Sequence, residues 1–135
     1  MTLTFVDAGV LIAAVRGVPA IARKAIEILD DDQRSFASSD FVRLEVLPKP
    51  LFHKNAEEAA FYEAFFEAVT GWAHWDESLL HEAFTLASRS GLSALDALHA
   101  AAALSMGAGE IVTTEKLGRP IHRIPGIRVT TIHPG

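Results

Sequence analysis

Four acidic side chains are the candidates for chemistry in this sequence, and they stand far apart along the chain: Asp7, Glu45, Asp96 and Glu115. Carboxylates that face one another without basic partners repel, so their pKa values rise unless a cation lies among them. Oxygen ligands of this kind favour hard divalent ions, Mg²⁺ or Mn²⁺. Such a centre orients water, lowers its pKa and stabilises negative charge on phosphate. The chemistry that follows is phosphodiester hydrolysis.

Each acid taken singly also has a structural interpretation. Asp96 stands three residues after Ser93 in a capping-box pattern and could simply stabilise its helix. Glu45 could be an exposed helical residue, and Glu115 could lie in a polar surface loop. Asp7 differs, because an acid that directly ends an apolar strand is poorly accommodated unless it is hydrogen-bonded or coordinated. The set is therefore more informative than any one member.

The elements that must position these acids alternate between strands and helices. We expect strands over 3–6, 35–38, 72–75, 111–113 and 127–132, and helices over 10–15, 20–29, 55–69, 77–90 and 93–106. A further helix, capped by Ser39 or Asp40, carries Glu45 and should be broken at Pro48 and Pro50. This order predicts a single domain over 1–135 with an α/β fold: three layers, α/β/α, around a mostly parallel sheet of four to five strands.

In an open parallel sheet, the ligand site lies outside the carboxyl ends of the strands. The four acids map to that edge, so we expect the fold to gather them there. Thr113 and Thr114 offer hydroxyls at the same edge, where one of them could hold a water or a phosphate. His99 follows Asp96 by one helical turn and is either a core histidine or a support for the pocket.

Composition narrows the class of protein. The chain has 135 residues, a formal net charge of -5 and no cysteine, which excludes thiol catalysis, thiolate metal sites and disulfides. No histidine pair has the spacing of a helical zinc site, and no glycine-rich phosphate loop is present. No apolar run is long enough to cross a bilayer and none resembles a signal peptide, so we expect a cytoplasmic protein. Basic residues gather near the C-terminus and form either a phosphate-binding or a solubilising segment: Lys116, Arg119, His122, Arg123 and Arg128.

Four segments together resemble the PIN-domain ribonucleases, particularly the small VapC-type toxins of toxin–antitoxin modules. They occur in that family's order and span most of the chain: Phe-Val-Asp-Ala-Gly-Val-Leu-Ile at 5–12, Arg-Leu-Glu-Val-Leu at 43–47, Gly-Leu-Ser-Ala-Leu-Asp-Ala-Leu-His-Ala-Ala at 91–101 and Ile-Val-Thr-Thr-Glu at 111–115. The resemblance implies that Asp7, Glu45 and Asp96 are catalytic, metal-binding acids. It places Glu115 where the family has a fourth acid, commonly Asp, and makes Thr113 the supporting hydroxyl residue before it.

The resemblance also implies an activity and partners. These are Mg²⁺- or Mn²⁺-dependent endonucleolytic cleavage of RNA, neutralisation by a small antitoxin that inserts a segment into the active-site groove, and a homodimer. The sequence departs from the family pattern twice. Gly9 replaces the Ser, Thr or Asn two residues after the first acid, and Glu115 is one methylene longer than Asp. Either change could lower activity.

Two other functions remain open at this stage. One is a phospho-receiver-like binding module, in which Asp7 helps to bind Mg²⁺ and Lys116 lies near the end of the fourth strand. The other is a noncatalytic PIN-like interaction protein. Its partner surface would be the aromatic stripe of the helix over 55–69: Phe61, Phe65 and Phe66.

Overall fold

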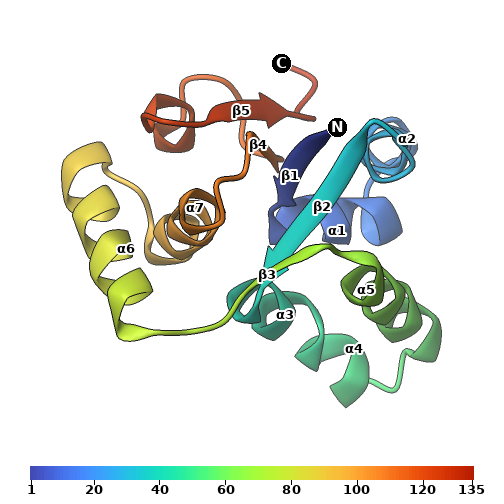
Figure 1. The fold of residues 1–135 in the computed structure, drawn as a ribbon. Coiled ribbons are helices and arrows are strands. Elements are labelled where there is room, and N and C mark those ends of the chain that lie inside the picture. Colours follow the sequence, from blue (N-terminus) through green and yellow to red (C-terminus); the bar gives the residue numbers. More distant parts are fainter.

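A five-stranded parallel sheet runs through the centre of the computed structural model, which describes residues 1–135 (Figure 1). The strand order is β3-β2-β1-β4-β5, and every neighbouring pair is parallel. The predicted α/β fold with a mostly parallel sheet is therefore confirmed. The strands are β1 (Thr2–Val6), β2 (Arg34–Ser39), β3 (Gly71–Ala73), β4 (Glu110–Thr113) and β5 (Arg128–Thr131).

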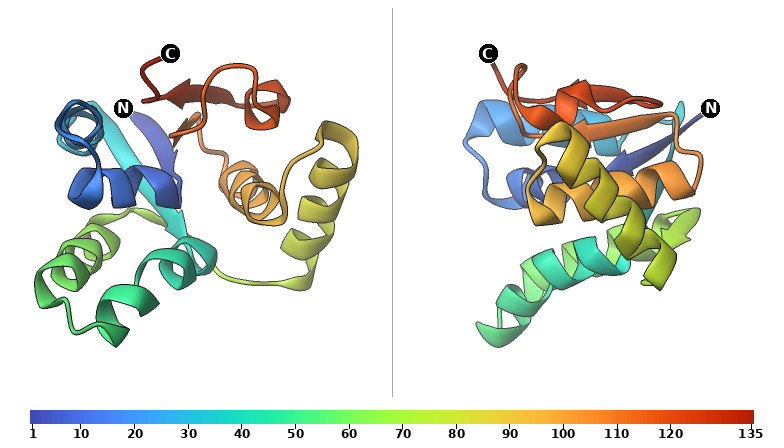
Figure 2. Two further views of the ribbon diagram at one scale, coloured as in Figure 1. Left: turned by 180° about the vertical axis from the view of Figure 1, so that it is seen from behind. Right: turned by 90° about the vertical axis from the view of Figure 1, so that its left-hand side faces the viewer.

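Helices cover both faces of this sheet, as the predicted layering requires (Figures 1 and 2). On one face α7 packs against β2, β3 and β4, and α6 lies outside α7. On the other face α1 packs against β4 and contacts α2 and α3. The helices are α1 (Ala8–Arg16), α2 (Pro19–Leu29), α3 (Asp40–Val46), α4 (Pro48–Phe52), α5 (Ala56–Ala68), α6 (Glu77–Ser90) and α7 (Ala94–Ser105), with a short 3-10 helix, η1 (Pro120–Arg123).

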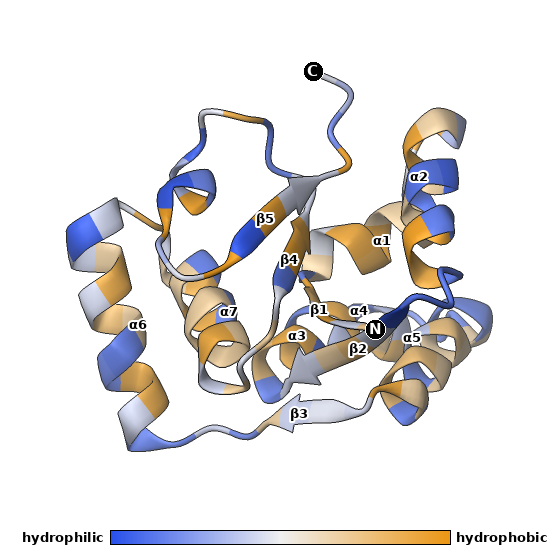
Figure 3. Cartoon of the chain, turned by 45° about the horizontal axis from the view of Figure 1, so that its top comes forward, coloured by the Kyte–Doolittle hydropathy of each residue, from blue (hydrophilic) through white to orange (hydrophobic).

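Local sequence accounts for where most helices begin. Five helices start after a polar residue whose side chain accepts a hydrogen bond from a free backbone amide of the first turn. These caps are Asp7, Ser39, Asn55, Asp76 and Ser93. Figure 3 shows apolar residues concentrated along α1 and α7, which pack against the sheet, whereas α6 alternates polar and apolar turns. Capping and patterning therefore agree with the fold.

Two boundaries differ from the sequence prediction. The helix that carries Glu45 does end before Pro48, but a new helix, α4, begins at that proline. Proline is tolerated in the first helical turn, where the missing amide would have had no partner. The third strand covers Gly71–Ala73 rather than 72–75. Beyond this strand, the Trp75 amide donates to Asp40 Oδ2 at 2.8 Å.

The aromatic stripe of α5 lies against the core rather than forming a free surface. The Phe65 and Phe36 rings are 5.9 Å apart between centroids, and the Phe66 ring meets Trp72 edge-on at 5.5 Å. Phe61 is also partly buried against the core. The stripe thus attaches α5 to β2 and β3. The stripe is thus a partly buried face, and Phe61 and Phe65 still line an apolar pocket of about 320 Å³.

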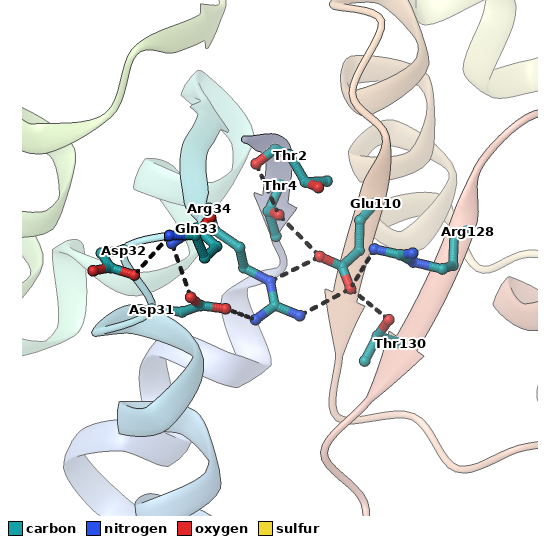
Figure 4. Close-up of polar contacts among 9 residues, drawn as sticks. All are labelled: Thr2, Thr4, Asp31, Asp32, Gln33, Arg34, Glu110, Arg128 and Thr130. Carbon is teal, nitrogen blue, oxygen red and sulfur yellow. Dashed lines mark hydrogen bonds and ion pairs between the residues drawn. The ribbon is translucent and has the colours of Figure 1, made fainter.

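A buried carboxylate joins the amino ends of four strands (Figure 4). Glu110 opens β4 and is 1% exposed. Its carboxylate accepts hydrogen bonds from Arg34 of β2, from Thr4 of β1 at 2.9 Å and from Thr130 of β5 at 2.6 Å. Burial alone would raise the pKa of Glu110, but these donors outweigh it and lower the pKa to about 2. We call this group the Glu110 cluster.

The sheet order also bears on the receiver-like interpretation. Receiver domains have the order 2-1-3-4-5. Here β1 lies between β2 and β4, and β3 is at the edge. The fold is therefore not that of a receiver domain.

None of the helices is long and apolar enough to span a membrane.

Candidate active site

A pocket of about 130 Å³ opens at the carboxyl ends of β1 and β4, opposite the Glu110 cluster. We call it the acid pocket. All four acids named from the sequence line it, although 108 positions separate the first from the last: Asp7, Glu45, Asp96 and Glu115. The sheet topology therefore brings together the set that the sequence predicts to converge. Gly9, His99 and Thr114 are also part of its lining.

Asp7 is the most enclosed of the four acids. It follows β1, is 9% exposed, and caps α1 by accepting the Val10 amide on Oδ1 at 3.2 Å. Its own amide donates to Val112 O of β4 at 3.0 Å, which fixes the backbone of the residue. Burial raises the pKa of Asp7 to about 6, and the Asp96 charge adds to this, while Thr113, His99 and the Val10 amide oppose it. The fold thus holds Asp7 where its charge is poorly solvated.

Asp96 is half-buried in the first turn of α7. Ser93 Oγ accepts the Asp96 amide at 3.3 Å, so the serine caps the helix and the Asp96 carboxylate lines the acid pocket. Burial raises the pKa of Asp96, and the charges of Glu115 and Glu45 raise it further. A helix cap by itself does not need these acidic neighbours. The local structure is therefore compatible with a ligand role as well as with capping.

Glu45 is held by a buried histidine. Its Oε1 lies 2.9 Å from His99 Nε2, and the His99 ring packs against Phe5 with centroids 6.1 Å apart. Because a carboxylate accepts hydrogen bonds, Nε2 carries the donated proton. His99 Nδ1 is buried and has no hydrogen-bond partner. Of the two sequence interpretations, His99 fulfils both: it is a core residue and a support of the pocket.

Glu115 is placed by the turn that follows β4. Its amide donates to Thr113 Oγ1 at 3.1 Å, and its carbonyl oxygen lies 2.9 Å from His122 Nε2. Thr113 is fully buried and does not line the acid pocket. The Glu115 carboxylate lies 3.5 Å from Arg119 Nε. Thr113 thus supports the turn, and Glu115 is the acid of the pocket with an arginine neighbour.

The donor set of the pocket fits a hard divalent cation in its chemistry. All four acids offer oxygen, and neither Asp7 nor Asp96 forms an ion pair with a lysine or arginine. No three acidic or histidine side chains lie close enough together, as they stand, to hold a metal ion. The all-oxygen donor set is the kind that Mg²⁺ prefers, whereas structural Zn²⁺ sites are built from cysteine and histidine.

A second pocket of about 340 Å³ adjoins the acid pocket and shares Asp96 and Glu115 with it. Ser93 and Arg119 also line this adjoining pocket. The C-terminal basic residues predicted as one segment are otherwise dispersed. Arg123 Nη1 donates to Gly118 O, and Arg128 lies 3.5 Å from Glu110 at the opposite end of the sheet. Arg119 is the arginine that the fold brings to the acids, and the sequence did not distinguish it from its neighbours.

Comparison with known proteins identifies the family and similar folds. The family model of the PIN domain matches residues 4–117. No curated protein matches the chain in sequence. Among solved structures, VapBC2 from Rickettsia felis, bound to a DNA fragment of its promoter, is similar with a TM-score of 0.69 and 17% identity, covering 96% of this chain and 98% of that one.

Two further structures have the same fold. DNA-bound VapBC from Salmonella typhimurium has a TM-score of 0.67 and 19% identity, over 98% of this chain and 99% of that chain. The Mycobacterium tuberculosis toxin VapC20, described as cleaving the sarcin-ricin loop, has a TM-score of 0.64 and 15% identity, over 93% and 98%. At these identities the likeness concerns the fold.

Proposed function

The chain belongs to the PIN domain family, and we propose that it is a Mg²⁺- or Mn²⁺-dependent endoribonuclease that hydrolyses RNA phosphodiester bonds. One observation carries the proposal: four carboxylates from separate parts of the chain line one small pocket. Of these four acids, neither Asp7 nor Asp96 has a lysine or arginine to balance its charge. The hydrolase class is supported by the family and by the description of VapC20 as a sarcin-ricin loop cleaving toxin.

We assign the holding of the cation to Asp7, Asp96 and Glu45, with Glu115 as a fourth acid. A bound divalent ion supplies Lewis acidity, which lowers the pKa of water and neutralises charge on the phosphate. The chain supplies orientation. Asp7 is fixed by its backbone bond to β4, Glu45 is fixed by His99, and the turn that carries Glu115 is fixed by Thr113.

The adjoining pocket supports RNA as the substrate class. Its lining includes Arg119, which presents a guanidinium beside the shared acids Asp96 and Glu115. Guanidinium groups bind phosphate through paired donors. A net acidic protein can therefore still bind a polyanion locally, with one phosphate near the acids and the next near Arg119. We propose that the two pockets together form the RNA groove.

We further propose that the chain is the toxin of a toxin–antitoxin module, acts in the cytoplasm and forms a homodimer. Two of the similar structures are described as VapBC bound to DNA, and another is described as a toxin–antitoxin complex from Klebsiella pneumoniae. Apolar side chains exposed on α3 and α4 support a partner surface: Leu44, Leu51 and Phe52 are 71%, 59% and 81% exposed. The proposed partner is a small antitoxin protein.

The decisive test is RNA cleavage by the purified protein with Mg²⁺ or Mn²⁺, with EDTA, and with Asp7→Ala. We expect cleavage by the wild type with metal, and loss of cleavage with EDTA or with the variant. Equal rates in the wild type and the variant, or cleavage that EDTA leaves intact, would refute the mechanism. Calorimetry without any Mg²⁺ or Mn²⁺ binding would instead favour a noncatalytic PIN-like binding protein.

A further inference from the structure

Gly9 and Thr114 approach each other closely at the edge of the acid pocket. A Cβ atom added at Gly9 would lie 2.5 Å from Thr114 Oγ1 and 3.3 Å from Thr114 Cγ2. Real Cβ atoms essentially never come within 3.0 Å of a heavy atom beyond their own residue and its chain neighbours. The Thr114 side chain therefore occupies the space that any side chain at position 9 would need.

The same geometry places the Thr114 hydroxyl beside Asp7. The Cβ position of Gly9 that lies 2.5 Å from Thr114 Oγ1 lies 3.4 Å from Asp7 Oδ1. Both Gly9 and Thr114 line the acid pocket. The hydroxyl and the most enclosed carboxylate thus flank the same small space beside Gly9, where a water molecule could contact both.

Thr113 and Thr114 differ in how their hydroxyls are used. Thr113 is fully buried, and its Oγ1 accepts the Glu115 amide at 3.1 Å. Thr114 is only partly buried, and its hydroxyl has no hydrogen-bond partner within the chain. A hydroxyl can both donate and accept. The Thr114 hydroxyl is therefore available to a molecule in the pocket, whereas the Thr113 hydroxyl already serves the Glu115 amide and the Asp7 carboxylate.

We propose that Thr114 is a positioning residue of the acid pocket. Its hydroxyl, which occupies the room left by the absent side chain of Gly9, hydrogen-bonds a water that Asp7 also holds in the shell of the divalent cation. This inference rests on the proposed function. It assigns to position 114 the polar group that position 9 lacks.

The first arm of the test measures ligand binding. Mn²⁺ is titrated into the wild type, Thr114→Val and Thr114→Ser by calorimetry. Valine keeps the shape of threonine without the hydroxyl, and serine keeps the hydroxyl. We expect about tenfold weaker Mn²⁺ binding for valine, at the lower end of outer-shell effects, and a change of less than about twofold for serine. Equal affinity in the wild type and the valine variant would overturn the inference, as would equal losses in both variants.

The second arm moves the hydroxyl and needs no activity measurement. Gly9→Ser alone should lower Tm, because its Cβ collides with Thr114. Adding Thr114→Ala should restore both Tm and most of the Mn²⁺ affinity, because the hydroxyl then comes from position 9. A Tm that the second substitution does not recover would overturn the packing relationship. Failure of the wild type to bind Mn²⁺ or cleave RNA would instead refute the proposed function, and this inference with it.

Discussion

Arg34 and Glu110, 76 residues apart in sequence, form a two-pronged ion pair across the amino end of the sheet, with Nε to Oε1 at 2.9 Å and Nη2 to Oε2 at 3.1 Å. Glu110 is 1% exposed, and the hydroxyls of Thr4 and Thr130 complete its shell. A buried charge is tolerated when it is paired and hydrogen-bonded in this way. At the opposite rim, Asp7 and Asp96 have no such basic partner, and the predictions below follow from that contrast.

Glu110→Gln should destabilise the protein near neutral pH. The pKa of Glu110 is lowered from 4.5 to about 2 in the folded state, so its stabilisation is complete above about pH 4.5 and disappears as pH falls through 2. The shift corresponds to about 3 kcal/mol. Urea unfolding at pH 7 and at pH 2 to 3 should show a large deficit of the variant only at pH 7. Glu82→Gln, at an exposed position of α6, is the control and should change little.

Asp7→Asn should stabilise the metal-free protein while abolishing metal-dependent cleavage. The folded pKa of about 6 exceeds the ordinary value of 3.8, so the folded state opposes ionisation of Asp7 and loses stability as pH rises through 6. Asparagine retains the oxygen that caps α1. At pH 7.5 in EDTA we expect the variant to have a higher Tm and a free energy of unfolding that is larger by up to about 3 kcal/mol. Below pH 3.8 we expect no gain in stability. A lower Tm at pH 7.5 would contradict the burial argument.

His99→Leu should weaken Mn²⁺ binding and cleavage by about tenfold, because Glu45 loses the donor that holds it. Leucine preserves apolar packing against Phe5, so thermal unfolding should change little by comparison. His99→Gln supplies a side-chain donor and should recover much of the lost function. The measurements are Mn²⁺ calorimetry and metal-saturated cleavage rates. Identical behaviour of the two variants would mean that His99 acts through packing alone.

Arg119→Ala should weaken RNA binding and reduce its salt dependence. One lost phosphate contact to single-stranded RNA lowers the slope of log affinity against log salt by about 0.7. Fluorescence anisotropy with labelled RNA in EDTA measures this without cleavage. Arg23→Ala, at an exposed position of α2, is the matched control. Equal slopes for Arg119→Ala and the wild type would exclude Arg119 from the proposed RNA groove.

The convergence of the acids was predictable because it depends on topology. Asp7 follows an apolar strand and Asp96 opens a capped helix, and parallel strands carry such positions to one edge. Local sequence rules also predicted most helix starts, because a capping residue such as Ser93 bonds to an amide in the first turn of the helix that it begins. The helix starting at Pro48 was missed because proline stops one helix and is compatible with the first turn of the next.

The Glu110 cluster and the pocket details depend on register, which the sequence pattern does not specify. Glu110 pairs with Thr4 on one side and Arg128 on the other only because β1, β4 and β5 align at those residues. The close approach of Gly9 and Thr114 likewise requires the first turn of α1 and the residues after β4 to lie side by side. Hydrophobic periodicity and residue spacing predict which residues lie at an edge of the sheet, whereas strand register and backbone shape decide which atoms come into contact there.

Strand β1 contains Thr4, which donates a hydrogen bond to Glu110, and it leads directly into Asp7, the residue after its last position. At about 3.3 Å per residue, these two positions are about 10 Å apart along one extended segment. A slip or tilt of β1 at Thr4 would therefore displace Asp7 without any substitution among the residues of the acid pocket. The position of the acid pocket thus depends on the Glu110 cluster at the other end of the sheet. Lost activity in a folded Glu110 variant would therefore indicate a displaced Asp7 rather than the loss of a catalytic group.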